Sequence, residues 1–292
     1  MPVTEPPRGR TYDVAGRKLL LDRAGTGGPP VVLLPGAGLV GLDYLNVHTA
    51  AAEFTTSVLY DRAGTGWSDP VALPRTAAEV ATELRELLRA AGVEGPYVLA
   101  AHSLGAAYAR RFTQLFPADV AGLLLLDPGH EDLFAHLPAE AAELNERMKQ
   151  AAAELPDLTE DQLRTARAQY AELFAKWPSD VREPLVEHHL TTWRTVLGET
   201  ANEDDVHAEL RAGGALPDVP LIVLTAMGRN PYWSQFGSEE LIAAAQSGIR
   251  DLHASIAAAV PRGEHRVLDD AAHQFLHIQR EDAVVRAIRD LS

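Results

Sequence analysis

Ser103 is the residue in this sequence whose surroundings most clearly suggest chemistry. It lies in the run Ala101-His102-Ser103-Leu104-Gly105, which follows a short apolar stretch and precedes a stretch with helical spacing. A serine between small residues at such a strand-to-helix turn matches the G-x-S-x-G nucleophile motif, with Ala101 in place of the first glycine. The turn exposes the hydroxyl and directs the first backbone N–H groups of the helix into the same space. The sequence therefore predicts that Ser103 is a nucleophile and that the Leu104 N–H stabilises an oxyanion.

The histidine and cysteine content of the sequence excludes several kinds of active site. The chain has eleven histidines and no cysteine, which excludes thiolate nucleophiles, disulfides and thiolate metal sites. His188 and His189 are adjacent, but neighbouring residues on a helix point in different directions, and no carboxylate pattern completes a metal site with them. We therefore expect no metal and no cofactor. A serine nucleophile needs instead a histidine base that is oriented by a carboxylate.

Length, charge and hydropathy exclude several classes of protein. The 292 residues carry 26 Lys and Arg against 41 Asp and Glu, a formal charge of −15, so nucleic acid and anionic membranes are poor partners. The first residues contain no apolar segment of a secretion signal, and no stretch approaches the roughly 18 apolar residues of a membrane-spanning helix. We expect a cytoplasmic protein without membrane insertion that acts on a small-molecule substrate.

Short apolar runs that alternate with helical patterns must position the reactive groups. Such alternation is typical of an α/β protein, with a mostly parallel twisted sheet covered by helices on both faces. A hairpin over 11–14 and 18–21 comes first, and Thr76 with Glu79 forms a capping box that begins a helix. The apolar runs that we expect to be buried strands are 31–34, 57–60, 97–101, 123–126, 221–224 and 266–268.

Residues 131–211 differ from the rest of the chain. They contain no strand-like run, are rich in alanine and have helical spacing, which predicts a helical insertion. Eighteen acidic residues stand against eight basic ones in this segment, so it holds most of the excess negative charge. The charge fits either a solvated helical surface or a lid whose field disfavours anionic substrates.

Four stretches of the chain together resemble one known superfamily. The order and spacing of the α/β-hydrolase superfamily are found in His102-Ser-Leu-Gly105, Tyr60-Asp-Arg-Ala-Gly-Thr-Gly-Trp-Ser-Asp69, Leu34-Pro-Gly-Ala-Gly38 and Ala272-His-Gln-Phe275. The chain is most similar to the capped, esterase-like members, in which a helical lid follows the sixth strand. The resemblance implies an α/β-hydrolase core over residues 1–130 and 212–292 and a helical cap over residues 131–211.

The resemblance implies that His273 is the base of the triad. His273 follows the last predicted strand and precedes the closing helix 281–288, which is where the family keeps its catalytic histidine. His277 lies only four residues further on, but the family motif matches at His273.

The resemblance also assigns the loop after the strand 31–34 to the oxyanion hole. In many members this loop has His-Gly-x, and here it has Pro35-Gly36-Ala37-Gly38. Only the backbone donates, so Ala37 N–H is the implied second donor, with Gly38 as the alternative. Asp61 and Arg62 lie in the stretch that packs beside this loop in the family, which implies that their roles are structural.

The acid of the triad is not where most of the family keeps it. The usual position after the strand 221–224 is occupied by Asn230, and an amide can orient a histidine but carries no charge. A minority of the superfamily takes its acid from the end of the preceding strand, where this chain has Asp127. The resemblance therefore favours Asp127 as the residue that orients His273. The carboxylates that stay as alternatives are Asp269, Asp270, Glu131 and Asp132.

These residues imply a serine hydrolase of the carboxylesterase type, with Ser103, His273 and Asp127 as the triad and an acyl-enzyme intermediate. Because the pocket candidates are apolar and no arginine is placed to bind an anion, we expect neutral, fairly hydrophobic esters or lactones as substrates. The residues that we expect to line the pocket are Leu39, Trp177, Trp193, Met227, Tyr232, Trp233 and Phe236.

Other activities on the same fold stay open. They include lactonase, thioesterase, amidase, carbon–carbon hydrolase and cofactor-free perhydrolase activity. Dehalogenases and epoxide hydrolases are disfavoured because their nucleophile is an aspartate where this chain has Ser103. A non-catalytic ligand-binding protein on this fold is the alternative from another class, and it would lack a member of the triad.

Overall fold

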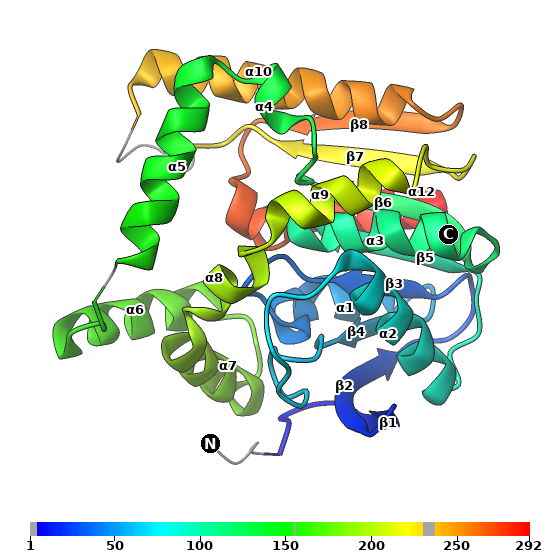
Figure 1. Ribbon diagram of the computed structural model, residues 1–292. Helices are drawn as coiled ribbons and strands as arrows, with labels where there is room; N and C mark the ends of the chain where they lie inside the picture. Colours follow the sequence, from blue (N-terminus) through cyan, green and yellow to red (C-terminus); the bar gives the residue numbers. More distant parts are fainter. Residues whose placement is uncertain (1–4, 155, 230–236) are drawn as a thin grey trace.

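The computed structural model describes residues 5–154, 156–229 and 237–292. Within them, eight strands form one sheet in the order β1-β2-β4-β3-β5-β6-β7-β8 (Figure 1). β1 and β2 are antiparallel to each other, β2 is antiparallel to β4, and the other neighbours are parallel. The strands are β1 (Arg10–Val14), β2 (Arg17–Ala24), β3 (Val31–Leu34), β4 (Ser57–Tyr60), β5 (Tyr97–His102), β6 (Val120–Leu126), β7 (Leu221–Ala226) and β8 (Gly263–Leu268). The predicted mostly parallel α/β sheet is confirmed.

Helices cover both faces of the sheet, which explains why the central strands are almost entirely apolar. In β3, Val32 and Leu34 belong to one buried cluster, while Val31 and Leu33 belong to the other. Successive side chains of a strand point to opposite faces, so a strand buried on both sides cannot alternate with polar residues. The first cluster is shared with α2 (Ala77–Ala90), α3 (Leu104–Leu115) and α10 (Glu239–Ala258), and the second with α1 (Leu45–Ala51) and α12 (Glu281–Leu291).

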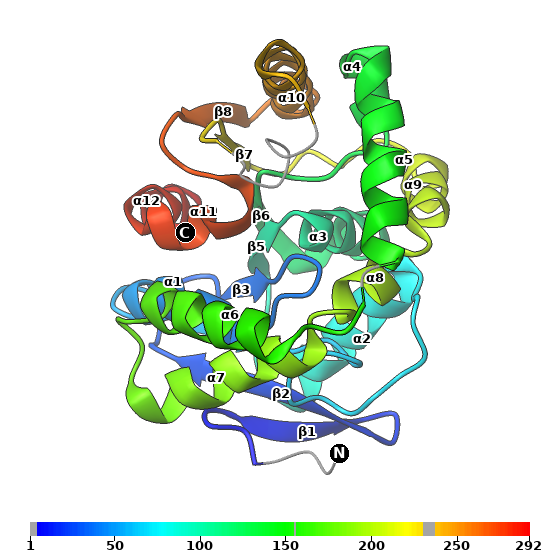
Figure 2. The same cartoon turned by 90° about the vertical axis from the view of Figure 1, so that its left-hand side faces the viewer.

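Six helices follow β6 before the chain returns to the sheet at β7, and no strand interrupts them in the described residues. Figures 1 and 2 show α5, α6 and α7 at the side of the molecule toward which β7 points. The helices are α4 (Leu133–His136), α5 (Ala139–Ala153), α6 (Glu160–Leu173), α7 (Ser179–Thr192), α8 (Thr195–Thr200) and α9 (Glu203–Ala212). This arrangement places helices of the cap over the carboxyl ends of the parallel strands, where ligands bind in sheets of this type.

Two buried polar contacts join the cap to the core beside α1. The Trp177 indole N–H donates to the carbonyl oxygen of Leu42 at 2.8 Å. The Nε2 atom of His189 on α7 lies 2.8 Å from an oxygen of Asp43, in the short helical turn η1 (Gly41–Tyr44). Burial would lower the pKa of His189, but the Asp43 carboxylate raises it above its usual value. The cap is thus fixed to the core by a charged hydrogen bond that is shielded from water.

None of the helices in the described ranges combines the length and the hydropathy that crossing a bilayer requires.

Candidate active site

Ser103 lies at the turn between β5 and α3. Its backbone has φ 50° and ψ −119°, a conformation that L-residues rarely adopt and that costs of the order of 1–3 kcal/mol. The close approach of the neighbouring loop explains the glycine two residues on. A Cβ at Gly105 would lie 2.4 Å from the carbonyl oxygen of Leu34 and 2.7 Å from that of Pro35. The turn therefore brings the serine, the start of α3 and the loop after β3 together.

His273 reaches Ser103 from the loop after β8. Its Nε2 atom lies 3.1 Å from the Ser103 hydroxyl oxygen, so the hydroxyl can donate to the ring. The two residues are 170 positions apart in the sequence. The His273 side chain is 39% exposed, which leaves it accessible to a substrate while Ser103 lies beside it.

Asp127 follows β6 and binds the other nitrogen of His273. The distance from His273 Nδ1 to Asp127 Oδ2 is 2.5 Å, and the second carboxylate oxygen accepts the Ala226 N–H at 2.9 Å. Burial raises the pKa of Asp127, but the hydrogen bond and the charge of His273 hold it below its usual value. Burial lowers the pKa of His273, and the Asp127 contact raises it above 6.5. The carboxylate therefore stays ionised at neutral pH and favours the protonated imidazole.

The other carboxylates that the sequence offered as acids have different surroundings. Glu131 makes two hydrogen bonds of 2.7 Å to the Arg110 guanidinium. Asp270 and Asp132 pair with Arg280 and Arg211, and Asp269 is exposed. Asn230 lies outside the described residues. Of the candidates that the structure describes, Asp127 is the one that contacts His273.

Leu104 directly follows Ser103, and the loop that carries Ala37 adjoins the serine, since a Cβ at Gly36 would lie 3.3 Å from the Ser103 Cβ atom. Among the described residues, neither Leu104 N–H nor Ala37 N–H has a hydrogen-bond acceptor. The alternative donor is engaged: Gly38 N–H donates to the Glu199 carboxylate at 2.8 Å. Leu104 N–H and Ala37 N–H are therefore both available to donate to a ligand. A tetrahedral oxyanion needs two donors of this kind.

A second series of hydrogen bonds, which the sequence did not indicate, links the loop after β3 (residues 35–38) to His273. Gly36 N–H donates to the Tyr44 hydroxyl at 3.3 Å, and that hydroxyl lies 2.7 Å from His102 Nδ1. His102 Nε2 lies 2.8 Å from the carbonyl oxygen of His273. Burial lowers the pKa of His102 well below 6.5, so the ring is neutral and donates from Nε2 to that carbonyl while Nδ1 accepts from Tyr44. In the sequence, the one signal for a role of His102 is its position next to Ser103. No sequence signal points to a role of Tyr44.

His253 on α10 is a further buried histidine, beside Asp127, that sequence reasoning did not single out. Its Nδ1 atom lies 3.7 Å from Asp127 Oδ1 and 2.8 Å from the Thr225 hydroxyl. Its Nε2 atom lies 3.0 Å from the carbonyl oxygen of Pro128, the residue after the acid. This contact holds the turn at which Asp127 adopts a positive φ of 44°.

A cavity of about 290 Å³ opens on the three side chains. The residues that line it are Ser103, Asp127, Pro128, Gly129, Leu133, Asn145, Glu203, Ala226, Gly228, Ile242, Gln246, Ile249, His253 and His273. Gln246 is held in place, because its amide nitrogen lies 3.0 Å from the carbonyl oxygen of Met227. The walls are therefore formed by α4, α5, α9 and α10 as well as by the strand ends.

Of the pocket residues predicted from the sequence, the four that the structure describes do not line this cavity. Leu39 and Trp177 belong to the buried cluster on the α1 side of the sheet, where the Trp177 indole bonds to backbone. The guanidinium carbon of Arg194 lies 4.1 Å from the centre of the Trp193 ring. The Met227 backbone accepts from Gln246 and donates to the carbonyl oxygen of Leu268, and Met227 is not among the residues that line the cavity. The predicted residues Tyr232, Trp233 and Phe236 lie outside the described residues. Long-range packing, which a single sequence does not reveal, decides which apolar side chains face the cavity.

Side chains that could bind a metal ion do not form a cluster in the part of the chain that the structure describes. No group of three or more His, Asp or Glu side chains is placed there to bind a metal ion. His188, one of the two adjacent histidines, stacks on Trp67 at a ring distance of 5.3 Å.

Comparison with known proteins agrees with this architecture. Among solved structures, a thermophilic esterase from Thermogutta terrifontis superposes with a TM-score of 0.59 at 20% identity, over 97% of this chain and 96% of the other. Est816, described as an N-acyl homoserine lactone degrading enzyme, superposes with a TM-score of 0.60 at 19% identity, over 97% and 100%. An epoxide hydrolase, CorEH, superposes with a TM-score of 0.65 at 17% identity, over 96% of each chain. Similarities at this level of identity show the fold alone.

The curated relatives match shorter stretches. Uncharacterized protein YqjL of Bacillus subtilis is 32% identical over 134 residues, which are 45% of this chain and 53% of YqjL. The putative carbamate hydrolase RutD of Escherichia coli is 35% identical over 97 residues, which are 33% of this chain and 36% of RutD. The chain thus spans about half the length of YqjL. It spans 14% of uncharacterized protein C23C11.06c of Schizosaccharomyces pombe and 17% of the probable transporter efuK of Hormonema carpetanum.

A family model covers most of the chain. The model described as alpha/beta hydrolase family matches residues 31–287, which include β3 at one end and part of α12 at the other. Together with the sheet order and the serine turn, this match shows that the chain belongs to the alpha/beta hydrolase family.

Proposed function

We propose that the protein is a serine hydrolase of the carboxylesterase type. The observation that carries the proposal is the continuous hydrogen-bonded series from Ser103 through His273 to Asp127 at the edge of a cavity. A hydroxyl, a neutral imidazole and an ionised carboxylate in this order are what acyl transfer by serine needs.

The reaction would proceed in two halves. The Ser103 oxygen attacks the ester carbonyl while its proton passes to His273 Nε2, and Leu104 N–H with Ala37 N–H bind the oxyanion. The tetrahedral adduct then expels the alcohol, which takes the proton from His273. Water attacks the acyl-enzyme in the same way, gives its proton to His273, and Ser103 regains a proton as the carboxylic acid leaves.

The cavity supports neutral and fairly hydrophobic esters or lactones as the substrate class. Leu133, Ile242 and Ile249 supply apolar walls. Apart from Ser103, His273 and Asp127, the polar side chains of the lining are Asn145, Gln246, His253 and Glu203. Glu203 also lines the cavity, so an anionic acyl group would meet a like charge there. Pockets for small ligands hold about 300–1,000 Å³, so a cavity of about 290 Å³ favours short acyl groups.

Hydrolysis of a series of p-nitrophenyl esters tests this proposal. We expect the wild type to release p-nitrophenol from the acetate and butyrate faster than from the octanoate and laurate. We expect Ser103→Ala to lower kcat by roughly 10⁴-fold or more, because the nucleophile is lost.

Labelling provides the control for the ester series. A fluorophosphonate should modify the wild type at one position and leave Ser103→Ala unmodified. Turnover that survives in Ser103→Ala would rule out Ser103 as the nucleophile. Absence of both turnover and labelling in the wild type would favour a non-catalytic ligand-binding protein.

A further inference from the structure

Arg62 binds two carbonyl groups of the oxyanion loop, which is residues 35–38 after β3. Its guanidinium is almost fully buried and donates to the carbonyl oxygen of Pro35 at 2.7 Å and to that of Gly36 at 3.0 Å. The Gly36 carbonyl belongs to the same planar amide as the Ala37 N–H, and the two groups of a trans amide point in opposite directions. By fixing the Gly36 carbonyl, Arg62 turns the Ala37 N–H away from the guanidinium.

The charge of Arg62 is balanced by a residue of the cap. Glu199, at the end of α8, accepts hydrogen bonds from Arg62 Nε at 2.9 Å and from Arg62 Nη2 at 2.7 Å on one carboxylate oxygen. Only 2% of the Arg62 side chain and 3% of the Glu199 side chain are exposed. An ion pair with so little exposure needs both partners, because either charge alone would be buried without compensation.

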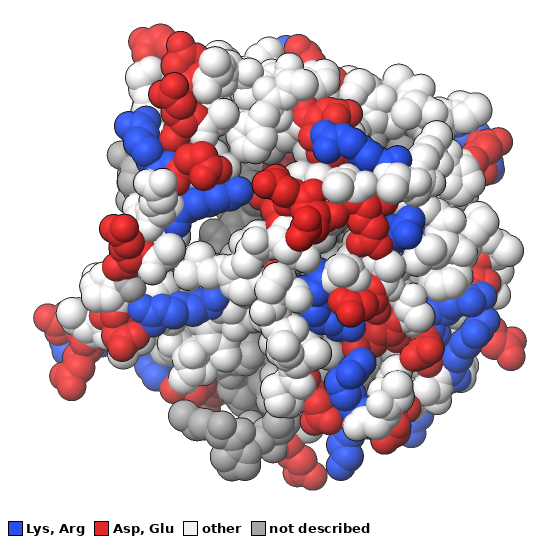
Figure 3. All heavy atoms as spheres, viewed as in Figure 1, with Lys and Arg blue, Asp and Glu red and all other residues white. Residues whose placement is uncertain are grey.

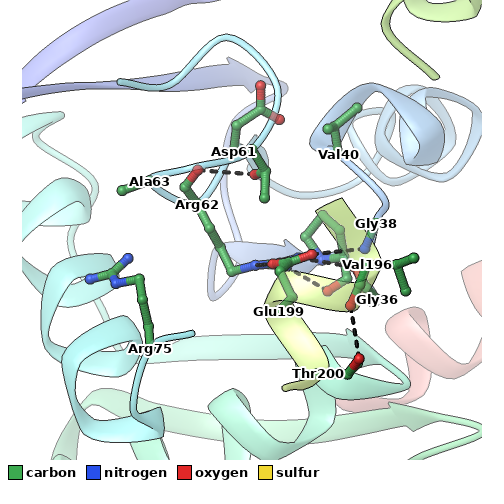
Figure 4. Close-up of polar contacts among 12 residues, drawn as sticks. Gly36, Gly38, Val40, Asp61, Arg62, Ala63, Arg75, Val196, Glu199 and Thr200 are labelled. Carbon is green, nitrogen blue, oxygen red and sulfur yellow. Dashed lines mark hydrogen bonds and ion pairs between the residues drawn. The ribbon is translucent and has the colours of Figure 1, made fainter. Parts of the chain in front are cut away.

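The second oxygen of Glu199 binds the oxyanion loop directly. It accepts the Gly38 N–H at 2.8 Å, and Figure 4 shows Glu199 lying between the Arg62 guanidinium and the Gly38 backbone. Val196 lies one turn earlier on the same face of α8 and packs on the same glycine. A Cβ at Gly38 would lie only 3.0 Å from the Val196 Cβ atom, and Gly38 has a positive φ of 71°.

The two amides that flank Ala37 are therefore held by one buried ion pair. Arg62 fixes the amide that carries the Ala37 N–H, and Glu199 fixes the following amide through Gly38 N–H. On its other side the loop lies against the nucleophile turn, since a Cβ at Gly36 would lie 3.3 Å from the Ser103 Cβ atom. A displacement of α8 would thus change the position of the loop relative to Ser103.

We propose that Glu199, a residue of the cap, is a positioning residue for the oxyanion hole. It accepts the Gly38 N–H, so that this group is not the oxyanion donor. Together with Arg62 it fixes the loop so that Ala37 N–H is the donor. This role rests on the proposed function, because it concerns the oxyanion of the acyl-transfer reaction. It makes the helical cap part of the catalytic machinery as well as a wall of the cavity.

Two substitutions at Glu199 and one control test this role. Glu199→Gln keeps the shape of the side chain but replaces one carboxylate oxygen by an NH2 group, which can only donate. The variant therefore loses either the bond from Gly38 N–H or the bonds from Arg62, and it loses the charge opposite Arg62. Glu199→Asp keeps the charge opposite Arg62 but withdraws the carboxylate by one methylene. Glu187→Gln is the matched control, because Glu187 also pairs with an arginine of the cap, Arg167, but 56% of its side chain is exposed.

The measurements separate positioning from folding. For each folded variant, kcat and KM are measured with p-nitrophenyl butyrate, together with the affinity for an alkyl trifluoromethyl ketone, whose adduct with Ser103 places an oxyanion in the hole. Loss of a whole oxyanion donor costs about 10²- to 10³-fold, so a misplaced donor should lower kcat and ketone affinity by about 10- to 100-fold. We expect KM to change less than about 3-fold, since the ground-state carbonyl carries little charge, and Glu187→Gln to behave as the wild type.

Each result has a definite meaning. Wild-type kcat and ketone affinity in both folded Glu199 variants would overturn the positioning role. If Glu199→Gln does not fold, Glu199→Asp decides alone, because it leaves Arg62 with a negative partner. Fluorophosphonate labelling of the wild type at Ser103 shows that a negative result concerns only Glu199. If the wild type is not labelled, the proposed function is wrong and the role of Glu199 is rejected with it.

Discussion

At the scale of single residues, the two oxygens of the Asp127 carboxylate make different hydrogen bonds. One oxygen binds His273 Nδ1, and the other is held by the Ala226 N–H of the neighbouring strand. The backbone bond fixes the carboxylate, so the imidazole is held with Nε2 toward Ser103. An acid at the end of β6 can therefore orient the base without a carboxylate at position 230.

We predict that Asp127→Asn lowers kcat by about 10⁴-fold with little loss of stability, because an amide favours the wrong imidazole tautomer and cannot stabilise the imidazolium. The pH profile should also move. His273 must be neutral to act as a base, and its pKa lies above 6.5 because of Asp127, so wild-type kcat/KM should rise with a midpoint above pH 6.5. In Asp127→Asn the remaining activity should rise at lower pH.

Asp270→Asn provides the control for this prediction, because Asp270 is an exposed carboxylate paired with Arg280. Its rate and pH profile should match those of the wild type. Full activity in Asp127→Asn would mean that another residue is the acid.

At the scale of elements, the site depends on how the cap is attached to the core. α8 contacts the oxyanion loop through Glu199, and α7 contacts η1 through the buried pair of His189 and Asp43. α9 contributes Glu203 to the cavity wall. The helices of the cap thus contact both the loop that carries Ala37 and the cavity beside Ser103.

The pair of Asp43 and His189 predicts a pH-dependent contribution to stability. The pKa of His189 is raised above 6.5, so its contribution is complete below pH 6.5 and is lost as the pH rises through its folded value. Burial raises the pKa of Asp43, but His189 holds it below 3.8, so its contribution is present above pH 3.8 and is lost as the pH falls through its folded value. The pair should therefore stabilise the fold most between about pH 4 and 6.5.

Urea unfolding of His189→Gln checks this window. We expect the variant to lose about 1.5–3 kcal/mol of unfolding free energy at pH 5, as for other hydrogen bonds to charged groups, and clearly less at pH 9. His136→Gln is the control, since His136 is exposed on α4, and it should show no such difference. An equal loss at both pH values would contradict the assignment of the charge to this pair.

At the scale of the whole molecule, part of the negative charge of the cap lies beside the cavity. The first turn of α9 carries Glu203, Asp204 and Asp205, and acidic side chains gather over α9 on the face shown in Figure 3. Glu203 also lines the cavity. The charge of the cap is therefore close enough to a bound substrate to influence its binding.

We predict that this field disfavours anionic esters. At low ionic strength, kcat/KM for a p-nitrophenyl hemisuccinate should lie roughly 10-fold or more below that for the neutral butyrate. Salt at about 0.5 M shortens the screening length to a few ångströms, so the difference should shrink. Identical salt dependence for the two esters would show that the acidic residues are only a solvated surface.

Much of this protein could be predicted from short-range sequence patterns. The apolar runs predicted the central strands because a strand buried on both faces must be apolar at each position, as β3 is. The small residues around Ser103 predicted its turn because backbone atoms of the next loop leave no space for a Cβ at Gly105. The positions of His273 and Asp127 came from resemblance to a family, and no local pattern distinguishes either residue from other histidines and aspartates.

The tertiary structure decided what depends on contacts between distant segments. It placed Ser103, Asp127 and His273 together across separations of up to 170 residues, and it placed Glu199 of the cap on Gly38. It also placed Trp177, between α6 and α7, in the core and Ile249 of α10 in the cavity wall, although both are apolar. Sequence patterns report which side of an element is buried, because burial follows the period of the strand or helix. They do not report which distant segment covers that side, because that depends on how the cap packs against the sheet.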